Sequence, residues 1–316
     1  DGAKMAVEKE QPAWEFEKTK KQAWERWNKE LSKIKIETSD DASRKIFYTA
    51  LYHTMVAPSL FSDVDGAYRG ADGKVYNKSR NVYTTMSLWD TYRAAMPLYH
   101  IIHPSKRADL INTMLDIFDE QGKLPVWHLM GNETDCMVGN PGVIAVAEAI
   151  VKGIEGIDKE RAYKACKASV MLDERGQDIR KKYGYIPCDL YEEACANDME
   201  YAIADAAVAN AARVLGHHED EKFFRNRSHS WRNFFDKETQ FVRGRTADGG
   251  WRTPFNPFSA EHRANDYCEG NAWQYTWLAP HDLKGLLEAF GGRDKMTHRL
   301  DSLFKAPSVL GKDASP

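Results

Sequence analysis

The chain has 316 residues, a formal net charge of −3, and 42% hydrophobic and 11% aromatic residues. That length and hydrophobic content suffice for a large domain with a buried core. The near-neutral charge gives no electrostatic basis for binding nucleic acid or an anionic membrane, and no stretch is long and apolar enough to span a bilayer.

The five cysteines are odd in number and lack the paired spacing of a zinc site. No signal peptide is visible, and the sequence opens at Asp1 rather than at a Met. We therefore expect that a leader or an upstream domain preceded this chain.

The first 85 residues are expected to hold two helices and a long loop. Residues 12–35 carry apolar side chains at helical spacing between Lys and Glu, which predicts an amphipathic helix. Residues 38–41 supply capping side chains for a second helix over 42–56. Residues 58–85 are polar and glycine-containing, which predicts an irregular loop. We expect a linker helix over 1–39 and a helical domain over 40–316.

Helical segments then recur in pairs along the rest of the chain. The expected helices cover residues 88–103, 105–121, 142–153, 159–172, 197–216, 220–235, 271–278, 281–290 and 293–304. Gly216 is a candidate C-cap, and residues 240–243 are a candidate hairpin arm. Successive antiparallel helix pairs predict an all-α fold of the α/α toroid class. In such a ring the polar clusters between helix pairs gather at one end and form the pocket.

The first polar cluster is residues 87–93. Asp90 and Arg93 lie three residues apart, so they share one face of the expected helix. One interpretation is a surface ion pair between them. The other is a carboxylate beside an aromatic ring, Trp89, at a sugar-binding site.

Two further polar clusters follow. Residues 124–139 contain Glu133, Thr134 and Cys136 in a segment with Pro and Gly. They either cap the helix that follows or form a wall of the pocket. Residues 195–205 contain Asn197 and Glu200, which suit the first turn of a helix.

The fourth cluster, residues 267–277, contains Glu269 before Gly270 and among Trp and Tyr. One interpretation is that Glu269 caps the next helix. The other is that it acts as a general acid, because a carboxyl group set among aromatic rings is poorly solvated and favours its protonated form. A glycosidase normally needs a second carboxyl group. Asp90, Glu133, Glu200 and Asp282 are all available, and composition does not choose among them.

These motifs, taken in order, resemble glycoside hydrolase family 92. The matching stretches are residues 87–93, 97–98, 122–127, 133–137, 200–202, 248–249, 269–275 and 280–282. The resemblance implies an exo-acting, inverting α-mannosidase of bacterial type that depends on calcium and cleaves terminal, often α-1,2, linkages in N-glycans or mannans. It also implies a periplasmic or secreted enzyme with a β-sandwich before the (α/α)6 barrel.

The same resemblance assigns roles to individual residues. Glu269 matches the general acid. The residues that match the substrate-binding wall are Asp90, Trp89, Arg93, Glu133, Thr134 and Cys136. The calcium ligands are not identified by the sequence.

The chain departs from the family pattern at both ends. It has no room for the β-sandwich, and it ends at Pro316, before the acidic motif that carries the general base. We therefore expect an inactive fragment whose partners are a mannose-containing oligosaccharide and the missing parts of its own polypeptide. A non-catalytic mannose-binding or scaffold protein remains open. So does another (α/α)6 glycosidase that uses Asp90 or Glu133 as its second carboxylate.

Overall fold

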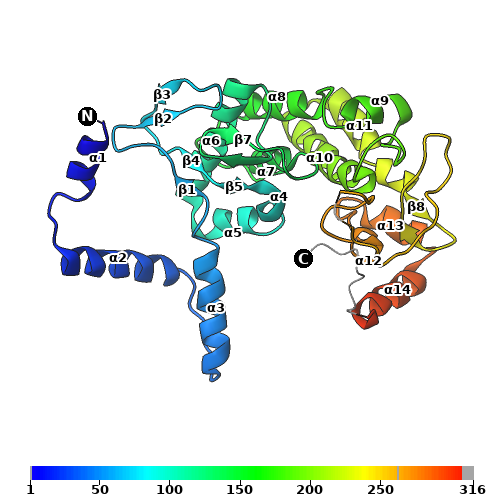
Figure 1. Cartoon of the computed structure of the whole chain (residues 1–316), viewed down its shortest axis with the longest axis horizontal. Coiled ribbons are helices and arrows are strands. Elements are labelled where there is room, and N and C mark those ends of the chain that lie inside the picture. The colour runs from blue at the N-terminus through cyan, green and yellow to red at the C-terminus, as the bar shows by residue number, and fades with distance from the viewer. Residues whose placement is uncertain (1, 262, 308–316) are drawn as a thin grey trace. The chain divides into compact units, whose positions relative to one another are not determined.

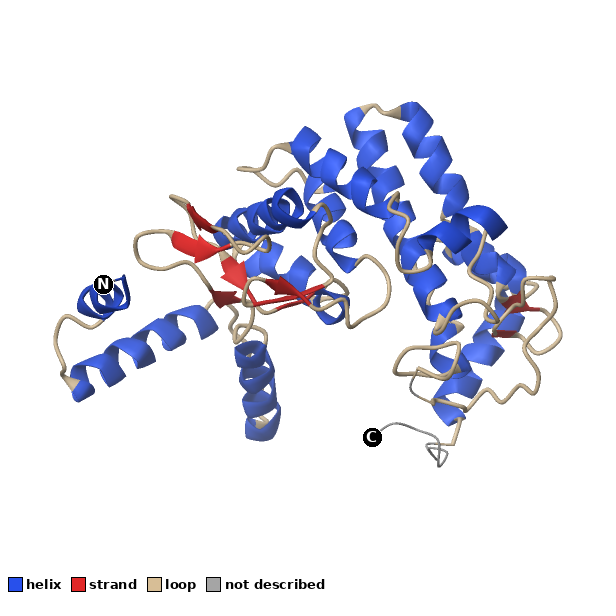
Figure 2. Ribbon diagram, turned by 45° about the horizontal axis from the view of Figure 1, so that its top comes forward, coloured by secondary structure: helices blue, strands red, loops and turns tan. Residues whose placement is uncertain are grey.

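The computed structural model describes residues 2–261 and 263–307. It divides into two compact units, residues 1–134 with 155–157 and residues 135–154 with 158–316 (Figure 1). Helices dominate both units and the strands are short (Figure 2), so the predicted all-α class is confirmed. Among the described residues, no helix is both long and apolar enough to cross a membrane.

The first unit mixes helices with short strand pairs. Its helices are α1 (Gly2–Glu10), α2 (Phe16–Leu31), α3 (Asp41–His53), α4 (Leu88–Thr91), α5 (Ala95–Ile102) and α6 (Pro104–Gln121). Its strands are β1 (Ser59–Leu60), β2 (Ala67–Arg69), β3 (Val75–Asn77), β4 (Tyr83–Thr84), β5 (Met86–Ser87), β6 (Trp127–Leu129) and β7 (Asn132–Glu133).

Local signals set several of these boundaries. The Asp40 side chain accepts from the N–H groups of Ala42 and Ser43 at 3.1 Å each, so the predicted cap of α3 is confirmed. Pro104 opens α6, where no N–H is needed, and left-handed Gly122 (φ +84°) ends it.

Two predictions for this unit are wrong. The stretch 58–85 is not a plain loop, because β1 pairs with β4 and β2 with β3. The predicted helix 88–103 is interrupted after Thr91 and resumes at Ala95. Pro97 lies in the first turn of α5, where its missing N–H costs nothing, whereas a continuous helix would need that N–H to reach Arg93. Asp90 and Arg93 therefore do not share a helix.

The second unit is built around one long helix. Its helices are α7 (Pro141–Val151), α8 (Lys159–Val170), α9 (Gln177–Tyr183), α10 (Ala194–Leu215), α11 (His218–Arg227), α12 (Ala272–Tyr275), α13 (Leu283–Ala289) and α14 (Arg293–Lys305), with a 3-10 turn η1 (Ser230–Asn233). Strands β8 (Phe235–Asp236) and β9 (Phe241–Val242) pair, which confirms the hairpin expected near residues 240–243.

Helix α10 packs against α7, α8, α11 and η1. It is buried on nearly every side as far as Ala212, which is typical of a central helix. Gly216 ends it with φ +80°, so the predicted C-cap is confirmed. Helix α9 was not predicted, and the expected helices 220–235 and 271–278 are shorter in the structure.

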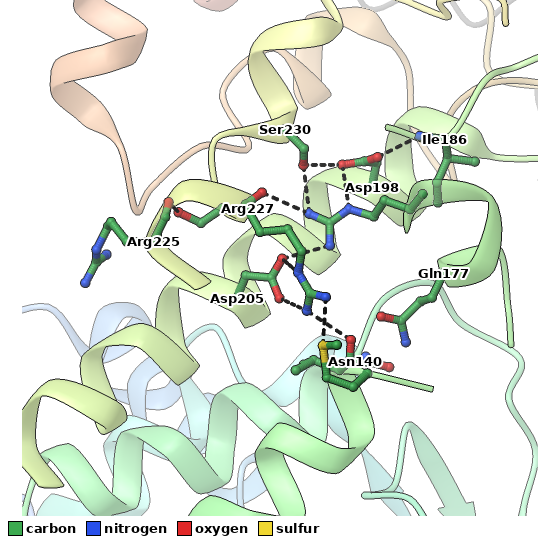
Figure 3. A network of polar contacts seen from close by, with 12 residues as sticks. Asn140, Gln177, Ile186, Asp198, Asp205, Arg225, Arg227 and Ser230 are labelled. Carbon is green, nitrogen blue, oxygen red and sulfur yellow. Dashed lines mark hydrogen bonds and ion pairs between the residues drawn. The ribbon is translucent and has the colours of Figure 1, made fainter. Parts of the chain in front are cut away.

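Buried charges fix α10 to its neighbours (Figure 3). Arg180 of α9 bonds to Asp198 at 3.2 Å and to Asp205 at 2.8 Å, and Arg227 of α11 bonds to Asp205 at 2.5 Å. Asp198 also accepts from the hydroxyl of Ser230. Because both aspartates are buried and fully engaged, we assign this network to folding rather than to substrate binding.

Candidate active site

A small sheet in the first unit brings together two of the predicted site segments. Strand β5 pairs with β6 through Ser87↔Trp127, and β6 pairs with β7 through His128↔Glu133. The N–H of Leu88 also donates to the carbonyl of Val126 at 3.3 Å. Residues 89–93 and 133–134, about 40 positions apart in sequence, therefore belong to one local structure.

The first of these segments presents a carboxylate and two aromatic rings that a single arginine contacts. Asp90 is exposed, and its carboxylate accepts from the hydroxyl of Ser87. The Arg93 guanidinium lies 5.2 Å from the centroid of the Trp89 ring and 4.6 Å from that of Tyr92. It also donates to the Tyr92 hydroxyl at 2.8 Å. These cation–π contacts hold the aromatic side chains in place next to Asp90.

Glu133 serves the backbone of this sheet. Its carboxylate accepts from the N–H groups of Val126 and Trp127 at 2.8 Å each and of Thr134 at 3.0 Å. The Thr134 hydroxyl donates to the carbonyl of Trp127 at 2.8 Å. The two side chains therefore fix the strand that carries Trp127.

In the second unit, Glu269 projects from a loop in an uncommon backbone conformation. Its side chain is exposed, and its φ is +46°, a left-handed value that costs a non-glycine residue about 1–2 kcal/mol. The expectation that aromatic neighbours shield this carboxyl group is wrong. Tyr267 and Tyr275 are instead buried beneath the loop, so their rings face the core.

Three anchors hold the loop. The Arg252 Nε lies 3.0 Å from both carboxylate oxygens of buried Asp266. The Tyr267 hydroxyl donates to the carbonyl of Val242 at 2.5 Å, and the Tyr275 hydroxyl donates to that of Cys268 at 2.6 Å. The residues on both sides of Glu269 are thus tied down, while Glu269 itself stays exposed to solvent.

The N-terminus of α10 contributes a fourth anchor. The N–H groups of Glu193 and Ala196 donate to the carbonyls of Asn265 and Asp266 at 3.0 and 3.1 Å. These bonds satisfy donors that the start of a helix leaves unpaired within the helix. The loop that carries Glu269 is therefore docked on α10.

Three carboxylates surround the thiol next to Glu269. Burial raises the pKa of Cys268, and the charge of Glu193, its hydrogen bond to the thiol, and the charges of Glu269 and Glu200 raise it further. Cys268 therefore stays protonated at neutral pH.

The segment after Cys136 is fixed to the same helix. Cys136 is exposed, and the following residues run to Gly139, whose φ is +77°. Arg175 lies 3.5 Å from the Asp135 carboxylate and donates to the Gly139 carbonyl at 3.1 Å. A Cβ on Gly139 would lie 2.4 Å from the Cβ of Glu200, so only glycine allows this approach.

Most of the candidate second carboxylates have structural partners. Glu200 is 1% exposed, and Glu133 accepts the three backbone bonds described above. Asp282 caps α13 through the N–H of Gly285 at 3.0 Å and pairs with Arg232 at 2.8 Å. Of the four, Asp90 alone has an exposed side chain.

The calcium ion that the family resemblance implies needs a group of oxygen ligands. Within residues 2–261 and 263–307, no group of three or more His, Cys, Asp or Glu side chains gathers so that it could hold a metal ion. Calcium takes six to eight oxygen ligands, usually with several carboxylates among them.

Sequence reasoning missed the residues that hold the two loops. Arg175, Arg252 and Gly244 carried no recognisable motif, because their partners lie far away in sequence. Gly244 is needed because a Cβ there would lie 2.1 Å from an Asp266 carboxylate oxygen. The one sequence signal for these anchors was Asp266, an acidic residue placed three residues before Glu269.

Comparison with known proteins places this geometry in a family. Residues 2–314 match the glycosyl hydrolase family 92 catalytic domain. The structure of the GH92 α-mannosidase BT3965 from Bacteroides thetaiotaomicron is similar with a TM-score of 0.91 and 37% identity, covering 97% of this chain and 41% of that one. The same enzyme in complex with mannoimidazole gives a TM-score of 0.93 and 36% identity, over 98% and 42% of the two chains.

Two further relatives are more distant. The GH92 inverting mannosidase BT2199 from the same bacterium has a TM-score of 0.90 and 29% identity, covering 98% of this chain and 43% of that one. An uncharacterized secreted glycosidase from Arthroderma benhamiae is 25% identical over 96% of this chain and 40% of its own length. The chain spans about two fifths of the length of these relatives. It belongs to glycoside hydrolase family 92 and shares the fold of that family's catalytic domain.

Proposed function

We propose that the polypeptide to which this chain belongs hydrolyses terminal α-mannosyl linkages, α-1,2 above all, in N-glycans or mannans, with inversion. The observation that carries the proposal is the anchored loop around Glu269 in a chain of family 92. A relative with 36% identity has been solved in complex with mannoimidazole, which supports a mannose-like substrate.

Glu269 is the general acid in this proposal. Its carboxyl group donates a proton to the glycosidic oxygen as the bond from that oxygen to the anomeric carbon breaks. A water molecule attacks the opposite face of the sugar and loses its proton to a carboxylate outside this chain. The left-handed backbone and the four anchors hold Glu269 at a fixed position. This reduces the entropic cost of placing its carboxyl group against the glycosidic oxygen that it protonates.

The first unit supplies the sugar-binding wall. We assign Asp90 to the hydroxyls of the terminal mannose, since its carboxylate is exposed and keeps acceptor capacity beside Ser87. Trp89 and Arg93 form the flat part of the wall. Glu133 and Thr134 act mainly by positioning it. In the second unit, Cys136 is also assigned to the substrate-binding residues, and it is exposed.

The proposal also covers the rest of the polypeptide. We propose that a β-sandwich and a C-terminal segment complete the site and that the enzyme is periplasmic or secreted, in line with a relative described as secreted. Calcium would act as a Lewis acid toward mannose hydroxyls. Since the described residues gather no carboxylate cage, most of its ligands would come from the remaining polypeptide.

Proton NMR of mannobiose hydrolysis by the full-length polypeptide tests this function. Inversion requires β-mannose as the first product, and removal of calcium with a chelator should abolish turnover. The 316-residue chain should be inactive with or without calcium. Formation of α-mannose first, or chelator-insensitive turnover, contradicts the proposal, and turnover by the 316-residue chain contradicts the placement of the base outside it.

A non-catalytic mannose-binding protein is the second candidate, because the two candidate second carboxylates of the second unit have structural surroundings: Glu200 is 1% exposed and Asp282 pairs with Arg232 at 2.8 Å. Calorimetry with mannose and calcium, together with absence of turnover in the full-length polypeptide, would favour it. A different (α/α)6 glycosidase using Glu133 as base is less favoured, since three backbone N–H groups already bind that carboxylate.

A further inference from the structure

The first unit contains a cavity of about 400 Å³ that the proposed reaction does not use. One wall is a single face of α2, because Arg26, Trp27 and Glu30 follow helical spacing. The other walls come from the link between α3 and β1, from β4, and from the junction of α5 with α6. The volume lies within the range of small-molecule sites, about 300–1,000 Å³.

Aromatic rings make the body of the cavity apolar. Trp27, Tyr83 and Tyr99 all line it. The Tyr99 hydroxyl donates to the carbonyls of Thr54 and Ala57 at 2.5 and 3.0 Å, so this ring is fixed as a wall. Trp27 is 36% exposed, and its ring centroid lies 4.7 Å from that of Tyr52 on α3. Flat rings of this kind suit an apolar, planar ligand.

The polar groups of the cavity are mostly cationic. Arg26 and Lys106 line it, and neither forms an ion pair within the part of the chain that the structure describes. The one lining carboxylate, Glu30, is already paired with Lys33 at 2.6 Å. Arg26 and Lys106 against Glu30 give the lining a net charge of +1, and Lys33 beside Glu30 offsets that one carboxylate.

His103 adds a neutral donor. It is 7% exposed, and burial lowers its pKa, with the charges of Lys33 and Lys106 lowering it further and that of Glu30 opposing them. The ring is therefore neutral at pH 7. The Lys33 ammonium lies 2.8 Å from Nδ1 and can only donate, so the ring proton is on Nε2.

We propose that this cavity is a binding site for a small organic anion with a flat apolar body. The body packs against Trp27, Tyr83 and Tyr99, and the carboxylate, sulfonate or phosphate accepts from the Arg26, Lys106 and His103 donors. The excess of cations over carboxylates in the lining, beside an aromatic wall, favours this class over a neutral sugar or a cation.

Calorimetric titration of the 316-residue chain with 2-naphthoate tests the site, with the neutral 2-naphthamide as matched ligand. Naphthoate should bind one to one and at least about tenfold more tightly than the amide, a difference of about 1.4 kcal/mol. Its affinity should fall as salt is raised. No binding of naphthoate at millimolar concentration, or equal binding of both ligands, overturns the proposal.

Variants on one helix separate the cavity from the rest of the surface. Trp27→Ala and Arg26→Gln should each weaken naphthoate binding about tenfold. Trp24→Ala and Lys29→Gln, which remove a tryptophan and a cation outside the cavity, should leave that binding unchanged. Trp27→Phe keeps an aromatic ring and should retain most of the affinity for naphthoate. This variant serves as the control in case Trp27→Ala misfolds. Equal losses of naphthoate affinity in the cavity variants and in the control variants would refute a site in this cavity.

Discussion

Replacing Gly139 with alanine should destabilise the second unit through a steric conflict with α10. The left-handed φ of +77° costs an alanine about 1–2 kcal/mol. The new Cβ would also lie 2.4 Å from the Cβ of Glu200, which cannot move aside without shifting the helix, and such overpacking costs about 1–3 kcal/mol more. The expected total is about 2–5 kcal/mol.

Gly216→Ala is the matched control for that variant. Its φ is +80°, and a Cβ there meets no atom within 4 Å, so it carries the backbone cost alone, about 1–2 kcal/mol. Urea unfolding followed by circular dichroism and tryptophan fluorescence measures both variants against the unchanged chain. Equal shifts of the two unfolding midpoints would refute the close packing of residues 135–139 on α10.

Three further perturbations test other parts of the structure. Arg180→Gln should lower the unfolding free energy by about 3–5 kcal/mol, because two buried aspartates lose their partner; a change below 1 kcal/mol on urea unfolding would contradict the network. Gly244→Ala, whose Cβ would meet a carboxylate oxygen at 2.1 Å, should speed proteolysis around residue 266, and an unchanged cleavage pattern would contradict that anchor. Burial lowers the pKa of His128 in the folded chain, and the charge of Glu133 opposes this shift. As the pH falls below about 6.5, the unfolded chain therefore binds a proton at this histidine before the folded chain does, and the folded state loses stability. His128→Phe should therefore lose less thermal stability than the unchanged chain between pH 7.5 and 5.5, and identical losses would refute this assignment.

Elements with strong local signals were predictable from the sequence. Helix α6 lies between Pro104 and left-handed Gly122, both of which are readable boundaries. Helix α10 and its C-cap at Gly216 were equally clear. The strands at residues 59–87 were not, because strands of two or three residues are too short to show alternation. Their pairing depends on contacts distant in sequence.

The environment of the candidate site could not be predicted from the sequence. The motif around Glu269 is visible in the sequence, yet its aromatic neighbours pack inward and leave the carboxyl group exposed. Sequence spacing also did not reveal that Asp266 pairs with Arg252, 14 residues earlier. Such partners are chosen by the tertiary fold, so local pattern cannot identify them.

The role of Glu269 is tested most directly by varying the leaving group in the full-length polypeptide. A general acid matters when the departing oxygen needs a proton, and much less when the leaving group is already a stable anion. Glu269→Gln should therefore lower kcat/KM for mannobiose by about 10²–10⁴-fold and that for 2,4-dinitrophenyl α-mannoside far less. Equal losses with both substrates, or no loss with mannobiose, would contradict the assignment of Glu269 as the acid.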